Sequence, residues 1–203
     1  MPVKNEFPQQ RWIVDQALRG TSIRDNNSDV MFNNLMNKFT SGNANKPGVY
    51  FDEENRRHLL SVRSVFAEAA GNLADKQRSP EAIKLLDKSE SLLSTQNFPY
   101  AMTSRYNSHN QTAMLYLEAA YKAGYKPLAQ KLKTAINKDL SDQKAYYDYL
   151  KTEKEDFYLS MAREADINDF MIQLLETIEK NYNTSKVPVQ ENPKRAADST
   201  GIK

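Results

Sequence analysis

Few side chains in this sequence could carry chemistry. The chain has 2 histidines, His58 and His109, and no cysteine. Neither histidine has a second one three or four residues away, so a metal site would require an assembled set of carboxylates. We therefore predict that both histidines are surface or helix-capping residues. The 6 glycines never form a phosphate-binding loop, so we expect no cofactor.

Two pairs of acidic residues are the other candidates for chemistry, Glu53/Glu54 and Glu153/Glu155. Glycoside chemistry needs two carboxylates held at a fixed distance in a cleft, and spacing on an exposed helix gives no evidence for that arrangement. Negative side chains at a helix start are stabilised by the helix dipole, which accounts for Glu53 and Glu54 without catalysis. The sequence predicts no catalytic residue.

Aromatic residues are concentrated in one short stretch, which contains Tyr146, Tyr147, Tyr149, Phe157 and Tyr158. One interpretation is a tyrosine-lined groove for a peptide or a sugar. The other is structural, because Tyr146, Leu150 and Phe157 lie at helical spacing and would pack in the core. The spacing favours the core. If a binding surface exists here, its candidates are Tyr146, Tyr149 and Tyr158.

Composition excludes some classes of function. The chain has 203 residues with 28 basic and 26 acidic side chains, and residues 184–203 account for the whole net charge of +2. A neutral body lacks the basic patch that binds nucleic acid, so no nucleic-acid partner is expected. No run of 18 apolar residues occurs, so we predict no membrane insertion. The polar first ten residues are unlike a signal peptide.

Apolar periodicity predicts an all-α fold. The clearest stripe has helical spacing and consists of Leu59, Val62, Phe66, Ala69, Ala70 and Leu73. The expected N-caps are Ser28, Asp52 and Ser79. Gly124 should end a helix in the left-handed conformation. Beyond residue 141, one helix is expected to run through Tyr146 and Phe157 to Met161.

Two predicted helical hairpins resemble each other. In each, an alanine-rich helix leads through a short turn to a helix opened by proline, and Ala82 and Ala129 correspond, 47 residues apart. Such hairpins are typical of tetratricopeptide-like repeats. We predict stacked antiparallel hairpins over residues 28–183. An irregular arm is expected at residues 1–27 and a disordered tail at residues 184–203.

Two motifs resemble a known family. The first ends in "NLMNKF" at residue 39, and the second is "PGVYFDEENRR" at residues 47–57. The residues that carry the resemblance are Asn34, Asn37, Lys38, Phe39, Gly48, Tyr50, Asp52, Glu53, Asn55 and Arg57. Over residues 19–182 the chain is similar to the soluble C-terminal region of a bacterial multi-pass membrane family of unknown function. That family itself resembles protein O-mannosyltransferases and related glycosyltransferases.

The resemblance implies tetratricopeptide-type hairpins on the periplasmic side of the inner membrane. It also implies a protein partner, either the membrane portion of the same family or an acceptor protein. The membrane spans and acidic loops expected to transfer the sugar are absent from this chain, so no catalytic residue is carried over. We predict a non-catalytic interaction domain. The alternatives are a carbohydrate-binding or carbohydrate-processing unit that uses the tyrosine-rich helix, and a free-standing adaptor.

Overall fold

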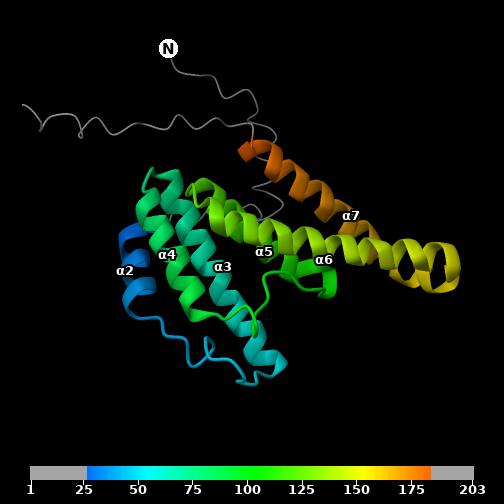
Figure 1. Ribbon diagram of the computed structural model, residues 1–203, viewed down its shortest axis with the longest axis horizontal. Coiled ribbons are helices and arrows are strands. Elements are labelled where there is room, and N and C mark those ends of the chain that lie inside the picture. Colours follow the sequence, from blue (N-terminus) through cyan, green and yellow to red (C-terminus); the bar gives the residue numbers. More distant parts are fainter. Residues whose placement is uncertain (1–26, 184–203) are drawn as a thin grey trace, which may run out of the picture.

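A computed structural model describes residues 27–183 of the chain (Figure 1). The predicted disordered tail and all but the last residue of the predicted arm lie outside the described residues. Within residues 27–183 the chain forms six α-helices and one short 3-10 helix, with no strand. The predicted all-α fold is therefore confirmed, whereas stacking of the tetratricopeptide type stays a prediction.

The helices follow one another with short connections, apart from two longer loops after α2 and α4. In chain order they are α2 (Ser28–Asn37), α3 (Glu53–Asp75), α4 (Ser79–Leu92), the 3-10 helix η1 (Arg105–Asn107), α5 (Ser108–Lys122), α6 (Lys126–Glu153) and α7 (Glu155–Asn183). The three successive pairs α3–α4, α5–α6 and α6–α7 each pack together, and α3 also packs along α5 in the centre of the body.

The core lies where α3, α4 and α5 meet. Phe66, Ala69, Ala70 and Leu73 of α3 are buried, as their spacing predicts. Leu59 and Val62, from the same predicted stripe, are partly buried and pack at the edge of this core. The small alanine side chains on α3 and α5 allow the two helices to lie close together, and close packing maximises dispersion contacts.

Helix capping agrees with the sequence at only one of three predicted positions. Asp52 caps α3, its Oδ1 accepting from the Asn55 amide at 2.8 Å. The prediction at Ser28 is wrong, because Asn27 caps α2 and its Oδ1 accepts from the amides of Asp29 and Val30. The prediction at Ser79 is also wrong, since Ser79 is already helical and no side chain caps α4. Pro80, in the first turn, lacks an N–H and has a fixed φ, which lowers the need for a cap.

The α5–α6 turn is closed at Gly124, as predicted. Gly124 has φ 75°. Its N–H donates to the Tyr121 carbonyl at 3.0 Å, and the Tyr125 N–H donates to the Ala120 carbonyl at 2.8 Å. These two bonds define a Schellman motif, which satisfies carbonyls that the helix end would leave unpaired.

We expect Gly124→Ala to lower the free energy of unfolding by about 1 kcal/mol, because an L residue in the left-handed region is strained. A Cβ at this position meets no atom within 4 Å, so the substitution reports backbone strain alone. Urea denaturation followed by circular dichroism measures the loss. Gly124→Asn is the matched control and should lose less, since asparagine tolerates this conformation. Equal stability of wild type and Gly124→Ala would contradict the prediction.

Helix α6 is one uninterrupted helix, and the chain reverses at Lys154 rather than continuing. The predicted helix from Tyr146 through Phe157 to Met161 is therefore wrong, because Lys154 has φ −146° and ψ 58°. Tyr146 ends up on α6 and Phe157 on α7. No glycine or proline stands at this turn, so the sequence contains no signal that breaks the helix there.

Polar contacts gather the two ends of the described chain at one end of the molecule. Lys76 Nζ donates to Ser28 Oγ at 2.9 Å, which ties the start of α2 to the end of α3. Lys122 forms ion pairs with Asp75 at 3.0 Å and with the buried Glu118 at 3.2 Å. The Tyr182 hydroxyl donates to Glu118 at 3.1 Å, so the last turn of α7 is held beside the ends of α3 and α5.

Candidate functional site

The α6–α7 hairpin runs past the rest of the described molecule. Helix α6 has 28 residues and α5 has 15. The two helices pack side by side from the turn at Gly124, so at about 1.5 Å per residue roughly 20 Å of α6 extends beyond the start of α5. Figure 1 shows α6 and α7 continuing together beyond α5. We call residues 141–164 the overhang.

One face of the overhang continues the face by which the hairpin packs on the body. Asp139 of α6 accepts a hydrogen bond from Asn110 of α5 at 2.7 Å, and Asn168 of α7 accepts one from Asn107 at 3.4 Å. Tyr146 lies seven residues after Asp139, and Phe157 lies eleven residues before Asn168. These spacings correspond to about two and three helical turns, so both aromatic residues share the body-facing side of the hairpin.

The aromatic side chains on the overhang are largely exposed. Tyr146 is 51% exposed, Tyr149 53% and Phe157 67%. The prediction that Tyr146 and Phe157 pack in the core is wrong, whereas Leu150 is buried as predicted. Two helices alone can cover only the stripe between them. Tyr147 takes that inner position and is 8% exposed.

Tyr158, the third candidate from the sequence, is partly buried and lies beside Lys151, whose Nζ is 5.8 Å from the ring centroid. The overhang thus brings Tyr146, Tyr149 and Tyr158 onto one hairpin. It places them on two helices rather than on one, with Lys154 between them. Phe157, which helical spacing assigns to the core, joins the exposed set.

Carboxylates flank the aromatic residues of this face. Glu153 follows Tyr146 by seven residues and Glu164 follows Phe157 by seven, so each lies on the same side of its helix. Neither forms an ion pair with another residue in the described part of the chain. Burial raises the pKa of the Tyr147 hydroxyl, and the negative charge of Glu164 adds to this shift. The body-facing side of the overhang therefore carries two aromatic residues and two carboxylates, and Arg163 lies at its root against Tyr106 of η1.

A buried amide network fixes the root of the overhang. Asn110 Nδ2 donates to Asp139 Oδ2 at 2.7 Å and to Asn107 Oδ1 at 3.0 Å. Gln143 Nε2 donates to the same two oxygens, at 2.7 and 3.1 Å. Asn168 Nδ2 donates to the Leu140 carbonyl at 3.1 Å, which joins α7 to α6. This network was not among the predictions from the sequence, where its only signal is polar residues inside apolar stripes.

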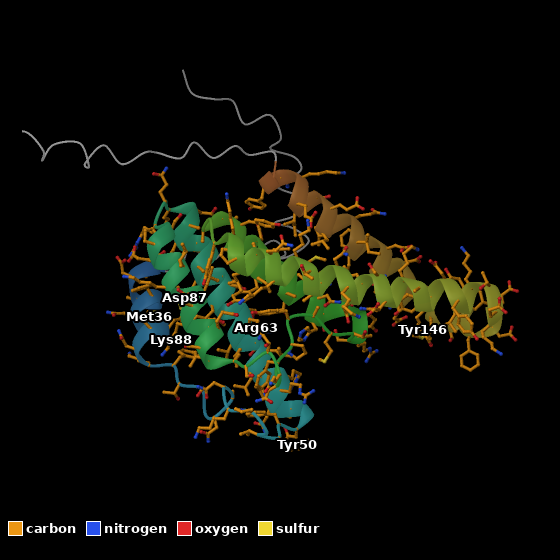
Figure 2. The ribbon with its side chains drawn as sticks, in the orientation of Figure 1. Met36, Tyr50, Arg63, Asp87, Lys88 and Tyr146 are labelled. Atoms are coloured by element: carbon orange, nitrogen blue, oxygen red, sulfur yellow. The ribbon has the colours of Figure 1, made fainter. Side chains whose placement is uncertain are left out.

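A second buried polar group occupies the centre of the body (Figure 2). Arg63 is 2% exposed and donates to the carbonyls of Phe98 at 2.8 Å and Pro99 at 3.0 Å. Its guanidinium lies 5.4 Å from the centroid of the Tyr100 ring. The hydroxyls of Tyr100 and Tyr116 both donate to Glu90. Burial lowers the pKa of Arg63, although the charge of Glu90 counteracts part of this shift.

The two histidines lie in different environments. His58 is exposed as predicted, with Nε2 2.8 Å from Glu54 Oε1. His109 lies at the start of α5, as predicted, but it is neither a surface nor a capping residue, because its side chain is buried and Nε2 donates to the Pro99 carbonyl at 3.1 Å. Burial lowers the pKa of His109. Among residues 27–183, no three histidine, aspartate or glutamate side chains form a group that could hold a metal ion.

The motif residues of the family resemblance lie away from the overhang. Asn34, Asn37, Lys38 and Phe39 lie at the end of α2, Gly48 and Tyr50 lie in the next loop, and Asp52, Glu53, Asn55 and Arg57 lie at the start of α3. Most of those with a described contact build local structure, such as the cap that Asp52 forms on the Asn55 amide, and Phe39 packs edge-on against Phe66 of α3. Tyr50 differs, since it is 86% exposed. Figure 2 shows Tyr50 at the N-terminal end of α3, well separated from Tyr146.

Comparisons of this chain with family models, curated proteins and solved structures found no match. Within residues 27–183, no helix combines the length and apolar character that crossing a membrane requires. The function of the protein must therefore be inferred from the geometry of the described residues and from the motifs of the sequence.

Proposed function

We propose that this protein is a non-catalytic interaction domain that binds an amphipathic helix of a partner protein along the body-facing side of the overhang. The observation that carries the proposal is the exposure of Tyr146 and Phe157 on a face that becomes buried further along the same two helices. Aromatic residues of this kind dominate the energetics of protein interfaces. Full burial of one such side chain contributes on the order of 1.5–3 kcal/mol.

The part of the α6–α7 hairpin near Gly124 is covered by a third helix, and the overhang lacks such a cover. Nearer the turn at Gly124, helix α5 packs against both α6 and α7 and covers their inner faces. Before the start of α5, η1 packs against α7 at the root of the overhang, and beyond η1 no other described element continues along this face. A helix from a partner would occupy the corresponding position and complete a three-helix layer, which is the helix-in-groove mode of recognition.

The flanking charges define the chemistry of that partner helix. Glu153 and Glu164 border the aromatic residues and form no ion pair within the described chain. A helix with an apolar stripe bordered by lysine or arginine would complement this face, whereas an acidic helix would be repelled. We therefore propose a basic amphipathic helix as the occupant.

The sequence motifs suggest where such a partner belongs. The motifs "NLMNKF" and "PGVYFDEENRR" resemble those of a bacterial membrane-protein family that is itself similar to glycosyltransferases. From this resemblance we propose that the domain belongs to, or acts with, such a membrane protein on the periplasmic side of the inner membrane. In this proposal the overhang holds the membrane portion or an acceptor protein in place and transfers no sugar itself. The support is the motif match at residues 34–57 together with the unpaired face of the overhang.

A designed helical peptide tests the proposal directly on the full chain. The probe is a peptide with a leucine stripe bordered by lysines, and its counterpart has glutamate in place of each lysine. We expect the lysine peptide to bind. Tyr146→Ala/Phe157→Ala should weaken this binding at least about tenfold, equivalent to about 1.4 kcal/mol. Isothermal titration calorimetry measures both dissociation constants.

Tyr50→Ala is the matched control, because Tyr50 is an exposed tyrosine far from the overhang and its loss should leave peptide binding unchanged. Equal binding of the glutamate peptide, or equal weakening by Tyr50→Ala, would contradict the proposal. A titration with mannose oligosaccharides distinguishes the carbohydrate alternative. Sugar binding that depends on Tyr146 would favour that alternative over helix binding.

A further inference from the structure

A second cluster of exposed side chains lies at the root of the overhang, where η1 meets α7. The guanidinium carbons of Arg105 and Arg163 lie 4.8 and 4.9 Å from the centroid of the Tyr106 ring. Arg105 Nη2 also donates to the Tyr106 hydroxyl at 2.9 Å. Tyr106 is 36% exposed, and both arginines are exposed. One tyrosine from η1 is therefore in contact with two cations that come from different elements.

The backbone at this cluster is strained. Tyr106 has φ 56° and Asn107 has φ 52°, so two successive residues other than glycine adopt the left-handed conformation. Each such residue costs about 1–2 kcal/mol, and strain of this kind gathers at functional sites. The buried Asn107 side chain holds the conformation, because its Oδ1 accepts from Asn110 and Gln143. The fold therefore maintains a costly turn that places Tyr106 against Arg163.

The two arginines lack acidic partners within the described chain. Some exposed cations are paired, such as Arg57 with Glu54 at 2.6 Å and Lys144 with Asp148 and Asp169. Neither Arg105 nor Arg163 forms an ion pair with any residue between 27 and 183. The Tyr106 hydroxyl accepts from Arg105, which leaves its own hydrogen free to donate. All the polar groups of the cluster are thus hydrogen-bond donors, and such a set matches an oxyanion.

We propose that Arg105, Tyr106 and Arg163 form a receptor for two neighbouring carboxylates of an acidic peptide. Each guanidinium is planar and can hold one carboxylate through two parallel hydrogen bonds. The two guanidinium groups are separate and both contact the Tyr106 ring. They therefore match two singly charged carboxylates on one peptide better than a single compact anion such as phosphate. The receptor does not depend on the proposed helix-binding face, whose flanking residues carry the opposite charge.

The test uses the full chain and three probes, which are a blocked tetraglutamate peptide, the corresponding tetraglutamine peptide and inorganic phosphate. We expect tetraglutamate to bind and tetraglutamine not to bind. Arg105→Ala and Arg163→Ala should each weaken tetraglutamate binding about fivefold or more, and the double variant should abolish it. Calorimetric titration gives the constants, and circular dichroism confirms that each variant is folded.

Two control variants assign the binding to this cluster. Arg57→Ala removes an exposed arginine that is already paired, so it should leave tetraglutamate binding unchanged. Tyr146→Ala/Phe157→Ala should also leave it unchanged, so the receptor can fail or succeed independently of the helix-binding face. The proposal is overturned if tetraglutamate does not bind, if the double arginine variant binds it as wild type does, or if phosphate binds more tightly.

Discussion

Replacing Arg63 with alanine is expected to lower the free energy of unfolding by about 3–5 kcal/mol. The wild-type guanidinium satisfies the carbonyls of Phe98 and Pro99 and neighbours the Tyr100 ring. Alanine would leave both carbonyls without this donor and open a cavity in the centre of the body. The negative charge of Glu90 would also lose its nearby cation.

Urea denaturation followed by far-ultraviolet circular dichroism measures this loss. Arg57→Ala is the matched control, because Arg57 lies on the same helix but is exposed, and we expect a change within about 0.5 kcal/mol. Arg63→Lys should fall between the two, since a lysine keeps the charge but cannot bind two carbonyls through a planar fork. A loss below about 1 kcal/mol for Arg63→Ala would show that the buried contacts contribute little.

Asn110→Leu should destabilise the protein by about 2–4 kcal/mol, although leucine has the same branched arrangement of side-chain heavy atoms. Asn110 is fully buried. Its amide nitrogen donates to Asp139 and Asn107, and its oxygen accepts from the Met102 amide at 3.3 Å. Leucine would remove one of the two amide donors to the Asp139 carboxylate and leave the Met102 N–H without this acceptor. The cost is large because partners left unsatisfied in the interior cannot bind water.

Gln130→Leu provides the control for this second substitution. Gln130 lies on the exposed side of α6, where its amide donates only to Thr134 at 3.4 Å, so its loss should change stability by less than about 0.5 kcal/mol. Thermal unfolding of the two variants measures the difference. If Asn110→Leu matches Gln130→Leu, the amide network at the root of the overhang does not stabilise the fold.

The apolar face of α3 and the glycine turn were predictable because each depends on local rules. Helical spacing reports which side of α3 is buried, and a glycine at a helix end reports a left-handed residue. Arg63 was not predictable. It lies within the α3 stripe, but its burial depends on two carbonyls from a loop 35 and 36 residues further along the chain. Spacing within one helix contains no information about such a loop.

The candidate site was predictable in location but not in exposure. The cluster of tyrosines in the sequence falls on the hairpin that carries the candidate site. Tyr146 and Phe157 nevertheless follow the spacing of core residues, and they are exposed only because α5 is shorter than the helices it covers. The length of a neighbouring helix is a property of the tertiary structure. Likewise, the reversal at Lys154 carries no glycine or proline that could have separated Tyr146 from Phe157.

The contacts that hold Ser28 at the end of α3 and Tyr182 near the end of α5 have a mechanical consequence. Helix α7 has 29 residues, so its last turn lies about 40 Å from its beginning at the overhang. A load applied through residue 28 therefore enters at Lys76, and one applied through residue 182 enters at the group formed by Glu118, Lys122 and Asp75. The overhang lies at the opposite end of α7 from these contacts. A molecule attached to a surface at residue 28 or residue 182 would hold Tyr146 and Phe157 away from that surface.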